Sequence, residues 1–190
     1  MPPRKLWAVA AVVACVALLA ACNIKETKSE DGKQKNVSIQ TPVGDMKIST
    51  QASAEQVGVA VYPGAQLKPK SGNDESSANV NISTSLFGVR VVVLEYVTDD
   101  VPDKVAEFYK KELAKYGAVL ECHTGRNPGS VVMKKSKDHE LSCDKDNHGN
   151  TLELKVGADD HQRVVAVKPG SKGTEFALVY VSTRGKDDSL

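Results

Sequence analysis

A nine-residue run, Val89 to Val97, constrains the fold of this chain more than any other segment. It reads VRVVVLEYV, with an apolar side chain at every position except Arg90 and Glu95. Successive side chains of a β-strand point to opposite faces, so a strand with this pattern needs apolar cover on both faces. The run therefore predicts a central strand, and the rest of the chain must supply what covers each face.

The segment after this strand has the signals of an amphipathic helix. Pro102 suits the first helical position, and Asp99, Asp100 and Asp103 lie where the helix dipole favours negative charge. Gly117 suits the position just after the last turn. Apolar residues recur at helical spacing and form one stripe, which consists of Val105, Phe108, Tyr109, Leu113 and Tyr116. We expect this stripe to cover one face of the sheet.

Short polar links separate several further apolar segments. Residues 118–122, 140–143, 151–156, 163–167 and 175–182 have strand composition. Links such as 157–162 and 169–173 allow hairpins but are too short for the crossover that joins parallel strands. The sequence therefore predicts an α+β fold: a mostly antiparallel sheet with one main amphipathic helix packed on a face.

The first 21 residues have the parts of a cleaved signal peptide. Arg4 and Lys5 give it a positive start, and an apolar run from Leu6 to Leu18 ends in small residues. The run through Ala21 has about 16 apolar residues, fewer than the roughly 20 that a spanning helix needs. We expect residues 1–21 to be removed.

The residues at the end of this leader, Leu19-Ala20-Ala21-Cys22, resemble the lipobox at which bacteria attach lipid to a cysteine. The resemblance implies a diacylglyceryl thioether on Cys22 and an acyl chain on its amine, and several chains anchor a protein stably where one does not. The segment ending at Cys15 also fits loosely, but it leaves a shorter apolar region. Asn23 follows Cys22 where the inner-membrane retention signal is typically Asp. We therefore expect an outer-membrane anchor facing the periplasm, with the inner membrane or the cell surface as alternatives.

Composition divides the rest of the chain. Residues 22–36 are almost entirely polar and predict a lipidated flexible tether. Residues 37–56 can form a short hairpin or a linker, residues 57–184 form a single α+β domain, and residues 185–190 form a disordered tail. The leader carries two of the 25 basic residues and none of the 24 acidic ones, so the remainder is almost neutral. It has no broad basic field for nucleic acid.

Several short segments suggest a family. They are the lipobox, VYPGA at 61–65, TDDVP at 98–102, FYKKEL at 108–113 and LEC at 120–122. Together they resemble a family of uncharacterised bacterial lipoproteins, of the acidobacterial type, with a YPGA segment and an FYKKEL helix. The resemblance covers most of the chain after Cys22 and implies no particular activity.

Two cysteines remain after the leader and the anchor are set aside. Cys15 leaves with the leader and Cys22 carries lipid, so Cys122 and Cys143 form an isolated pair in an oxidising compartment. This predicts a disulfide. The alternative is a metal site built from Cys122, His123, His139 and Cys143, although those spacings match no standard zinc module. Two free thiols are the third possibility.

No enzyme signature is found along the chain. Asp144 to Gly149 resembles the opening of a calcium loop, but the glutamate that completes such a loop is missing, and a polar turn is expected. We therefore assign no catalytic, metal or cofactor residue. Glu95 is the one carboxylate whose burial in an apolar strand can raise its pKa.

Two classes of function remain. The first is a non-catalytic binding or scaffolding module of the cell envelope, held at the membrane by Cys22, with an envelope protein as partner. The second is a small periplasmic enzyme or ligand-binding protein with a pocket between sheet and loops. A pocket that groups Glu95 with histidines favours the second, whereas a filled core and a flat exposed sheet face favour the first.

Overall fold

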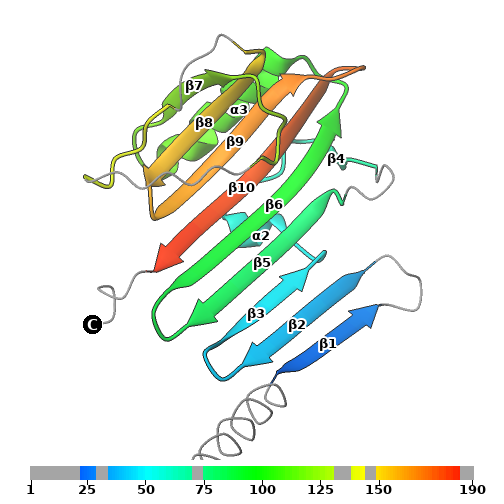
Figure 1. The fold of residues 1–190 in the computed structure, drawn as a ribbon. Helices are drawn as coiled ribbons and strands as arrows, with labels where there is room; N and C mark the ends of the chain where they lie inside the picture. Colours follow the sequence, from blue (N-terminus) through cyan, green and yellow to red (C-terminus); the bar gives the residue numbers. More distant parts are fainter. Residues whose placement is uncertain (1–21, 29–33, 70–74, 131–137, 144–148, 185–190) are drawn as a thin grey trace, which may run out of the picture.

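The computed structural model describes residues 22–28, 34–69, 75–130, 138–143 and 149–184. Ten strands form one antiparallel sheet (Figure 1). The strands are β1 (Asn23–Lys28), β2 (Lys35–Thr41), β3 (Gly44–Ser49), β4 (Gln66–Leu67), β5 (Ser77–Thr84), β6 (Gly88–Thr98), β7 (Leu120–Thr124), β8 (Thr151–Ala158), β9 (His161–Pro169) and β10 (Thr174–Arg184). The helices are α2 (Ala54–Val57), α3 (Pro102–Leu113) and a 3-10 turn, η1 (Ala114–Tyr116).

Two long strands hold the sheet together. The strand order is β1-β2-β3-β5-β6-β10-β9-β8-β7, and the short β4 pairs with the end of β6. β6 and β10 have 11 residues each and pair along their whole length, from Gly88 opposite Arg184 to Thr98 opposite Thr174. They connect a half of the sheet that α3 covers to a second half formed by β1, β2, β3 and β5 (Figure 1).

The main core lies between α3 and the sheet. Val105, Tyr109 and Leu113 of α3 are fully buried against the face of β6, β8, β9 and β10 that carries Leu94 and Phe176. Aromatic rings fill the centre of this core, where the ring centroids of Tyr109 and Phe176 lie 5.4 Å apart. The core side chains of the strands include Val92, Tyr96, Leu154, Val156, Val165, Val167 and Leu178.

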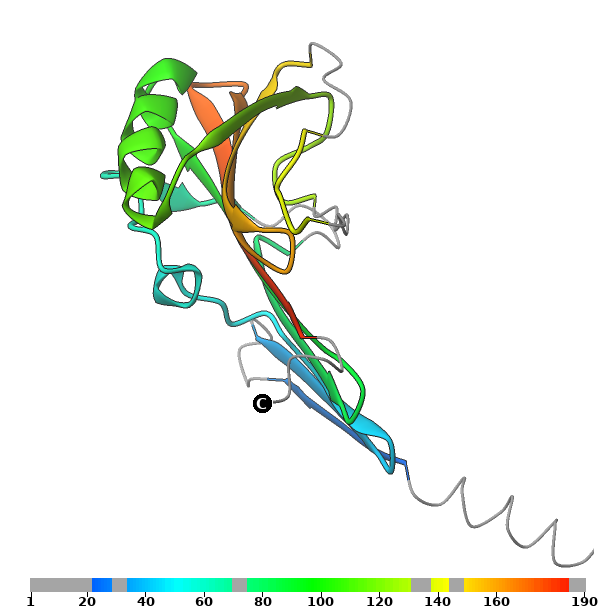
Figure 2. The ribbon, with the colours of Figure 1, turned by 90° about the vertical axis from the view of Figure 1, so that its left-hand side faces the viewer.

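A smaller cluster occupies the opposite face. Ala177, Val179 and Val181 of β10 are buried there, with Val91 and Val93 of β6 packed against them. Figure 2 shows α3 on one side of the sheet and the described parts of the segment between β7 and β8 on the other. The central strand β6 therefore has apolar neighbours on both faces, with Val92, Leu94 and Tyr96 in the main core and Val91 and Val93 beside the smaller cluster.

The prediction of an α+β fold with a main amphipathic helix is wrong. Strands hold 52% of the described residues and helical segments 13%, in a single sheet of ten strands with only a short helix. The helix begins at Pro102, yet it has 12 residues and covers only part of the sheet. Sequence reasoning missed β1 and the two-residue β4; β1 is exposed throughout and gains stability mainly from pairing with β2.

Two local predictions also differ from the structure. Residues 140–143 form no strand, so Cys143 lies in irregular chain. Tyr116 is 43% exposed, although its spacing placed it on the buried stripe. The reason is that the chain tightens into η1 after Leu113, and the changed rotation per residue turns Tyr116 out of the stripe.

The N-terminal part of the chain is more ordered than the tether prediction implied. Asn23–Lys28 forms β1, the edge strand next to β2, with every residue exposed. The segment 37–56 contributes β2, β3 and α2. The predicted leader (1–21), the predicted tail (185–190) and most of the calcium-loop resemblance lie outside the described residues. Within the described part of the chain, no helix has the length and apolar character needed to cross a bilayer.

Candidate binding face of the sheet

The predicted disulfide is confirmed. Cys122 of β7 is fully buried and is bonded to Cys143, with their Cα atoms 5.4 Å apart. Bonded sulfurs are not available as thiolate ligands, so the alternative metal site with Cys122, His123, His139 and Cys143 does not form. The bond ties the irregular segment before β8 to the edge strand β7.

His139 lies with two carboxylates instead. Its Nδ1 atom is 2.9 Å from Oδ1 of Asp159, which is almost fully buried, and 3.9 Å from Oδ2 of Asp160. One ligand atom from each of these residues falls within 4.8 Å of the others, so the trio can hold a divalent cation. The contact with His139 also satisfies the buried carboxylate of Asp159 without a bound ion.

Glu95 belongs to a group of ion pairs. Lys68 Nζ lies 3.3 Å from Glu95 and 3.2 Å from Glu175, and Lys168 Nζ lies 3.5 Å from Glu175. Burial raises the pKa of Glu175, but the hydrogen bonds and positive charges of Lys68 and Lys168 together outweigh it and leave that pKa below its usual value. The open cleft beside this group is lined by lysine, glutamate, asparagine, serine, proline and glycine residues, and no histidine is among its described lining. Glu95 is therefore a paired structural carboxylate.

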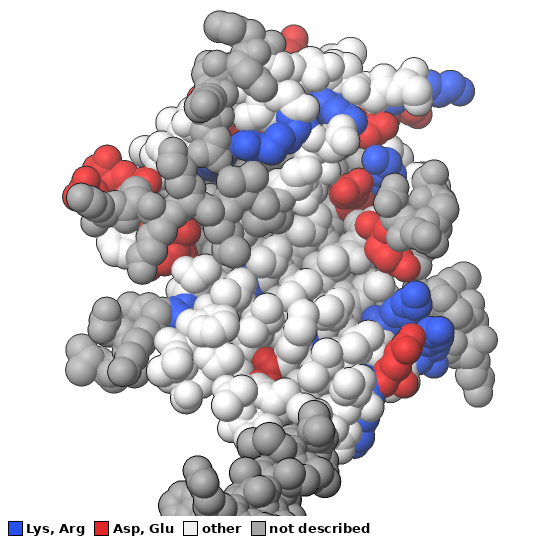
Figure 3. Space-filling view, in the orientation of Figure 1, with Lys and Arg blue, Asp and Glu red and all other residues white. Residues whose placement is uncertain are grey.

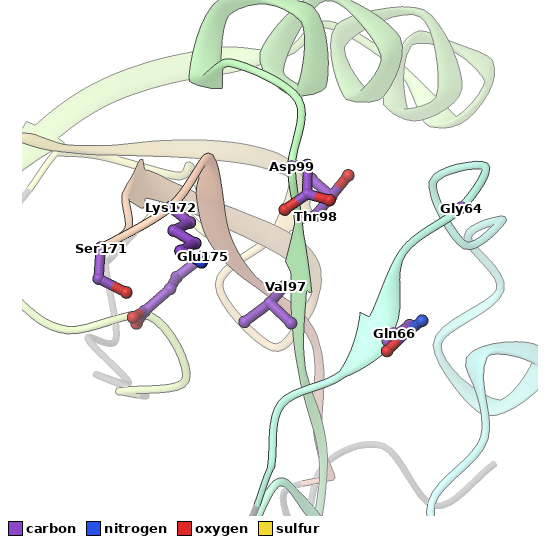
Figure 4. A pocket seen from close by; sticks show the side chains of 8 residues that line it. All are labelled: Gly64, Gln66, Val97, Thr98, Asp99, Ser171, Lys172 and Glu175. Atoms are coloured by element: carbon purple, nitrogen blue, oxygen red, sulfur yellow. The ribbon is translucent and has the colours of Figure 1, made fainter.

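A second open cleft lies at the end of β6 where α3 begins (Figure 4). Thr98 and Asp99 line it from β6 and the following turn, Lys172 and Glu175 from the β9–β10 connection and β10, and Gln66 from β4. In Figure 4 the polar ends of Gln66, Asp99 and Glu175 lie apart and do not point toward one another. The cleft lacks the convergent polar groups that a small-molecule site uses.

A charged cluster fills the space under the segment that follows β7. Glu153 and Lys155 of β8 are buried, and Glu153 accepts contacts from Arg126 at 3.3 Å and from Lys155 at 3.0 Å. Thr124 also donates a hydrogen bond to Glu153. Buried charges of this kind are tolerated because each is paired, so this cluster is explained by structure alone.

A surface without an assigned role is the face of β2, β3, β5 and β6 opposite α3. Strand pairing places apolar side chains in two rows across it. One row runs through Ile39, Met46, Ile82 and Val89, and the other through Val37, Ile48, Val80 and Val91. We call these eight residues the apolar face.

The eight side chains of the apolar face are half-buried by their neighbours in the sheet and are not part of the fully buried core. Seven of them, all except Val91, belong to neither buried cluster. Figure 3 looks onto this face and shows a broad, mostly uncharged area over β3, β5 and β6, with charged side chains gathered toward its edges. The reverse side of the same strands is polar, with Lys47, Asn81 and Arg90 in one row. The second half of the sheet is thus amphipathic, with its apolar side turned away from α3.

Sequence reasoning did not identify this face. Alternation at 37–40, 46–49 and 80–83 is visible in the chain, but it indicates only that each strand has one apolar side. Whether those sides coincide depends on the register between strands that are far apart in sequence. The sequence does show that the alternate residues of these strands are polar, and this rules out a strand that is buried on both faces.

No family model, no curated protein and no solved structure matches this chain. The resemblance to bacterial lipoproteins therefore stays a prediction from the sequence.

Proposed function

We propose that this protein is a lipid-anchored module of the outer membrane, facing the periplasm, which binds or scaffolds another envelope protein without catalysis. The anchor is Cys22, and the binding surface is the apolar face. The partner presents an apolar surface of its own, because the face offers almost no charge to pair with.

The position of Cys22 supports the anchor. Cys22 is exposed and directly precedes the first residue of β1. Lipid on its sulfur and amine lies clear of the main core, since β1 is the outermost strand of the sheet. Acylation at this position is therefore compatible with the fold.

The open apolar face carries the proposal. Soluble proteins rarely leave a contiguous apolar surface uncovered unless something binds there. Here the two rows span four adjacent strands, and the side chains on the reverse side are polar. The face is also rigid, because a continuous ladder of backbone hydrogen bonds fixes the position of each row.

The competing function, a small enzyme or ligand-binding protein, has less support. It required a pocket that groups Glu95 with histidines, and Glu95 is paired with Lys68 instead. The core between α3 and the sheet is filled by aromatic and aliphatic side chains. Both features are what a binding module needs, because it requires a firm scaffold rather than an internal cavity.

The anchor is tested by mass spectrometry of the mature N-terminus and by fractionation of Cys22→Ala. We expect an acylated Cys22 at the N-terminus, and we expect Cys22→Ala to leave the membrane fraction or to stay uncleaved. A mature protein that starts at another residue, or lacks lipid, contradicts the anchor.

The binding face is tested by photocrosslinking in intact cells. A benzophenone amino acid is placed at Ile48 and Val80, on the apolar face, and at the neighbouring Lys47 and Asn81, on its reverse. We expect the same envelope protein to be crosslinked from 48 and 80 and not from 47 and 81. Equal crosslinking from both sides, or none from 48 and 80, contradicts the proposal.

A further inference from the structure

Large exposed apolar side chains gather at one end of the sheet. Among the described residues, seven such side chains are exposed: Ile24, Val43, Leu67, Leu86, Phe87, Val101 and Tyr116. Four of them lie on β1 or in two strand connections: Ile24 (67% exposed), Val43 (74%), Leu86 (58%) and Phe87 (47%). We call these four residues the tip.

Strand pairing places the members of the tip together. Val43 lies in the β2–β3 turn, and Leu86 and Phe87 lie in the β5–β6 turn. Gly44 pairs with Thr84, so the two turns are neighbours, and Asn23 pairs with Gln40, so β1 begins at the same end. Figure 1 shows both turns and the start of β1 at the same end of the sheet. The tip therefore lies at the same end of the sheet as the residue that precedes Asn23, which is Cys22.

Side-chain hydrogen bonds fix the two turns. The hydroxyl oxygen of Thr84 accepts hydrogen bonds from the N–H groups of Leu86 and Phe87 and donates one to the carbonyl of Phe87. Thr41 does the same in the other turn, where it accepts from the N–H of Val43 and donates to the carbonyl of Gly44. Such side-chain bonds hold a turn in one conformation. The apolar side chains are thus presented outward by ordered turns.

We propose that the tip docks on the bilayer to which Cys22 is attached, with Val43, Leu86 and Phe87 in its interfacial layer. This proposal rests on the lipid anchor proposed above. The argument is one of position, because Ile24 is only two residues from the acylated cysteine, which leaves the tip within reach of the headgroups. Apolar side chains next to an acyl anchor bury further apolar area in the interfacial layer and so fix the orientation of the protein on the bilayer.

The rest of the molecule agrees with this orientation. The other three exposed apolar side chains are separate from the tip: Leu67 pairs with Tyr96 near the far end of β6, and Val101 and Tyr116 flank α3. β6 extends from Gly88 at the tip to Thr98, a length of about 30 Å at the usual rise per residue. Docking at the tip therefore directs α3 away from the membrane.

A single tryptophan can report the position of the tip. The chain has one tryptophan, Trp7 in the predicted leader. The reporter Phe87→Trp and the matched control Leu67→Trp, which is also exposed, are each made together with Trp7→Phe. The lipidated proteins are reconstituted in vesicles of phosphatidylethanolamine and phosphatidylglycerol, with and without brominated phosphatidylcholine, and flotation of the vesicles measures anchoring.

We expect both proteins to float with the vesicles. Emission from the reporter at position 87 should shift to the blue and be quenched by the brominated lipid, whereas emission from position 67 should do neither. Flotation without quenching at 87 overturns the docking of the tip and leaves the anchor intact. Equal quenching at both positions also overturns it.

Two further outcomes are distinguishable. A blue shift at 87 that bromine does not quench, and that disappears on dilution, means that a second copy of the chain covers the tip and overturns the proposal. Protein that does not float overturns the anchor, and the docking of the tip falls with it.

Discussion

The hydroxyl oxygen of Tyr109 accepts a hydrogen bond of 3.0 Å from the backbone N–H of Tyr62. Tyr109 belongs to α3 and is fully buried, whereas Tyr62 lies in the irregular segment before β4. The side chain of Tyr62 in turn donates a hydrogen bond of 2.8 Å to Asp100, just before α3. The two tyrosines therefore join that segment to the helix through the core.

Removing this hydroxyl tests its contribution. Tyr109→Phe leaves the N–H of Tyr62 without its acceptor, and an unsatisfied buried donor costs about 1 to 3 kcal/mol. We expect the free energy of unfolding in urea to fall by that amount. Tyr116→Phe is the control, because its hydroxyl bonds to the carbonyl of Gly58 at an exposed site where water can replace it. Equal effects of the two substitutions contradict the assignment.

Alkaline pH should lower the stability of the folded protein through the same residue, Tyr109. Burial raises the pKa of Tyr109 above its ordinary value of 10.0. Above pH 10 the unfolded chain therefore loses this proton while the folded protein keeps it, so the free energy of unfolding falls as the pH rises. The steepest slope is about 1.4 kcal/mol per pH unit. In urea melts at pH values from about 9 to 11, on either side of the ordinary tyrosine pKa of about 10, the unfolding free energy of Tyr109→Phe should fall less steeply with pH than that of the parent protein. Parallel slopes speak against a buried Tyr109.

The disulfide should contribute substantially to stability. Cys122 and Cys143 are separated by 21 positions, and closing a loop of this size stabilises a protein by about 3 kcal/mol on the chain-entropy model. We expect Cys143→Ser to lower the free energy of unfolding by that amount, measured in a Cys22→Ala background. Reductant should destabilise the parent to a similar extent and leave Cys143→Ser unaffected. If reductant leaves the free energy of unfolding of the parent protein unchanged, the bond is contradicted.

Alanine substitutions at two glycines distinguish the cost of backbone strain from the cost of steric overlap. Gly64 and Gly173 both have positive φ, 78° and 64°. A Cβ on Gly64 meets nothing within 4 Å, so Gly64→Ala should cost only about 1 kcal/mol of backbone strain. A Cβ on Gly173 overlaps the carbonyl oxygen of Thr98, so Gly173→Ala should cost about 1 to 3 kcal/mol more. Similar thermal midpoints for the two variants show that the β9–β10 connection does not pack on Thr98.

Signals carried by neighbouring residues were read successfully from the sequence. The apolar run at Val89–Val97 became β6 between β5 and β10, and Pro102 begins α3. The pairing of Cys122 with Cys143 needed only the removal of the other two cysteines from consideration. Each of these depends on local composition or on counting.

Features that depend on register were not predicted. Asn23–Lys28 has the composition of a tether and forms a strand only because β2 offers a free edge. Met46 and Ile82 are 36 positions apart, and nothing local shows that they are cross-strand neighbours. The apolar face and the tip both arise from such pairings, which is why the candidate site emerged from the structure.

The pairing of β1 also determines how the protein responds to mechanical force. A pull on Cys22 enters β1 at Asn23, whose pair with Gln40 is the first in the ladder. A load directed across the strands opens the pairs one after another, as in a zipper, whereas a load along β1 shears all of them together. Because β1 is exposed throughout and contributes no core residue, it can peel off while α3 and β6–β10 stay folded. Its six residues span about 20 Å when extended, so a detached β1 acts as a tether of that length between Cys22 and the rest of the sheet.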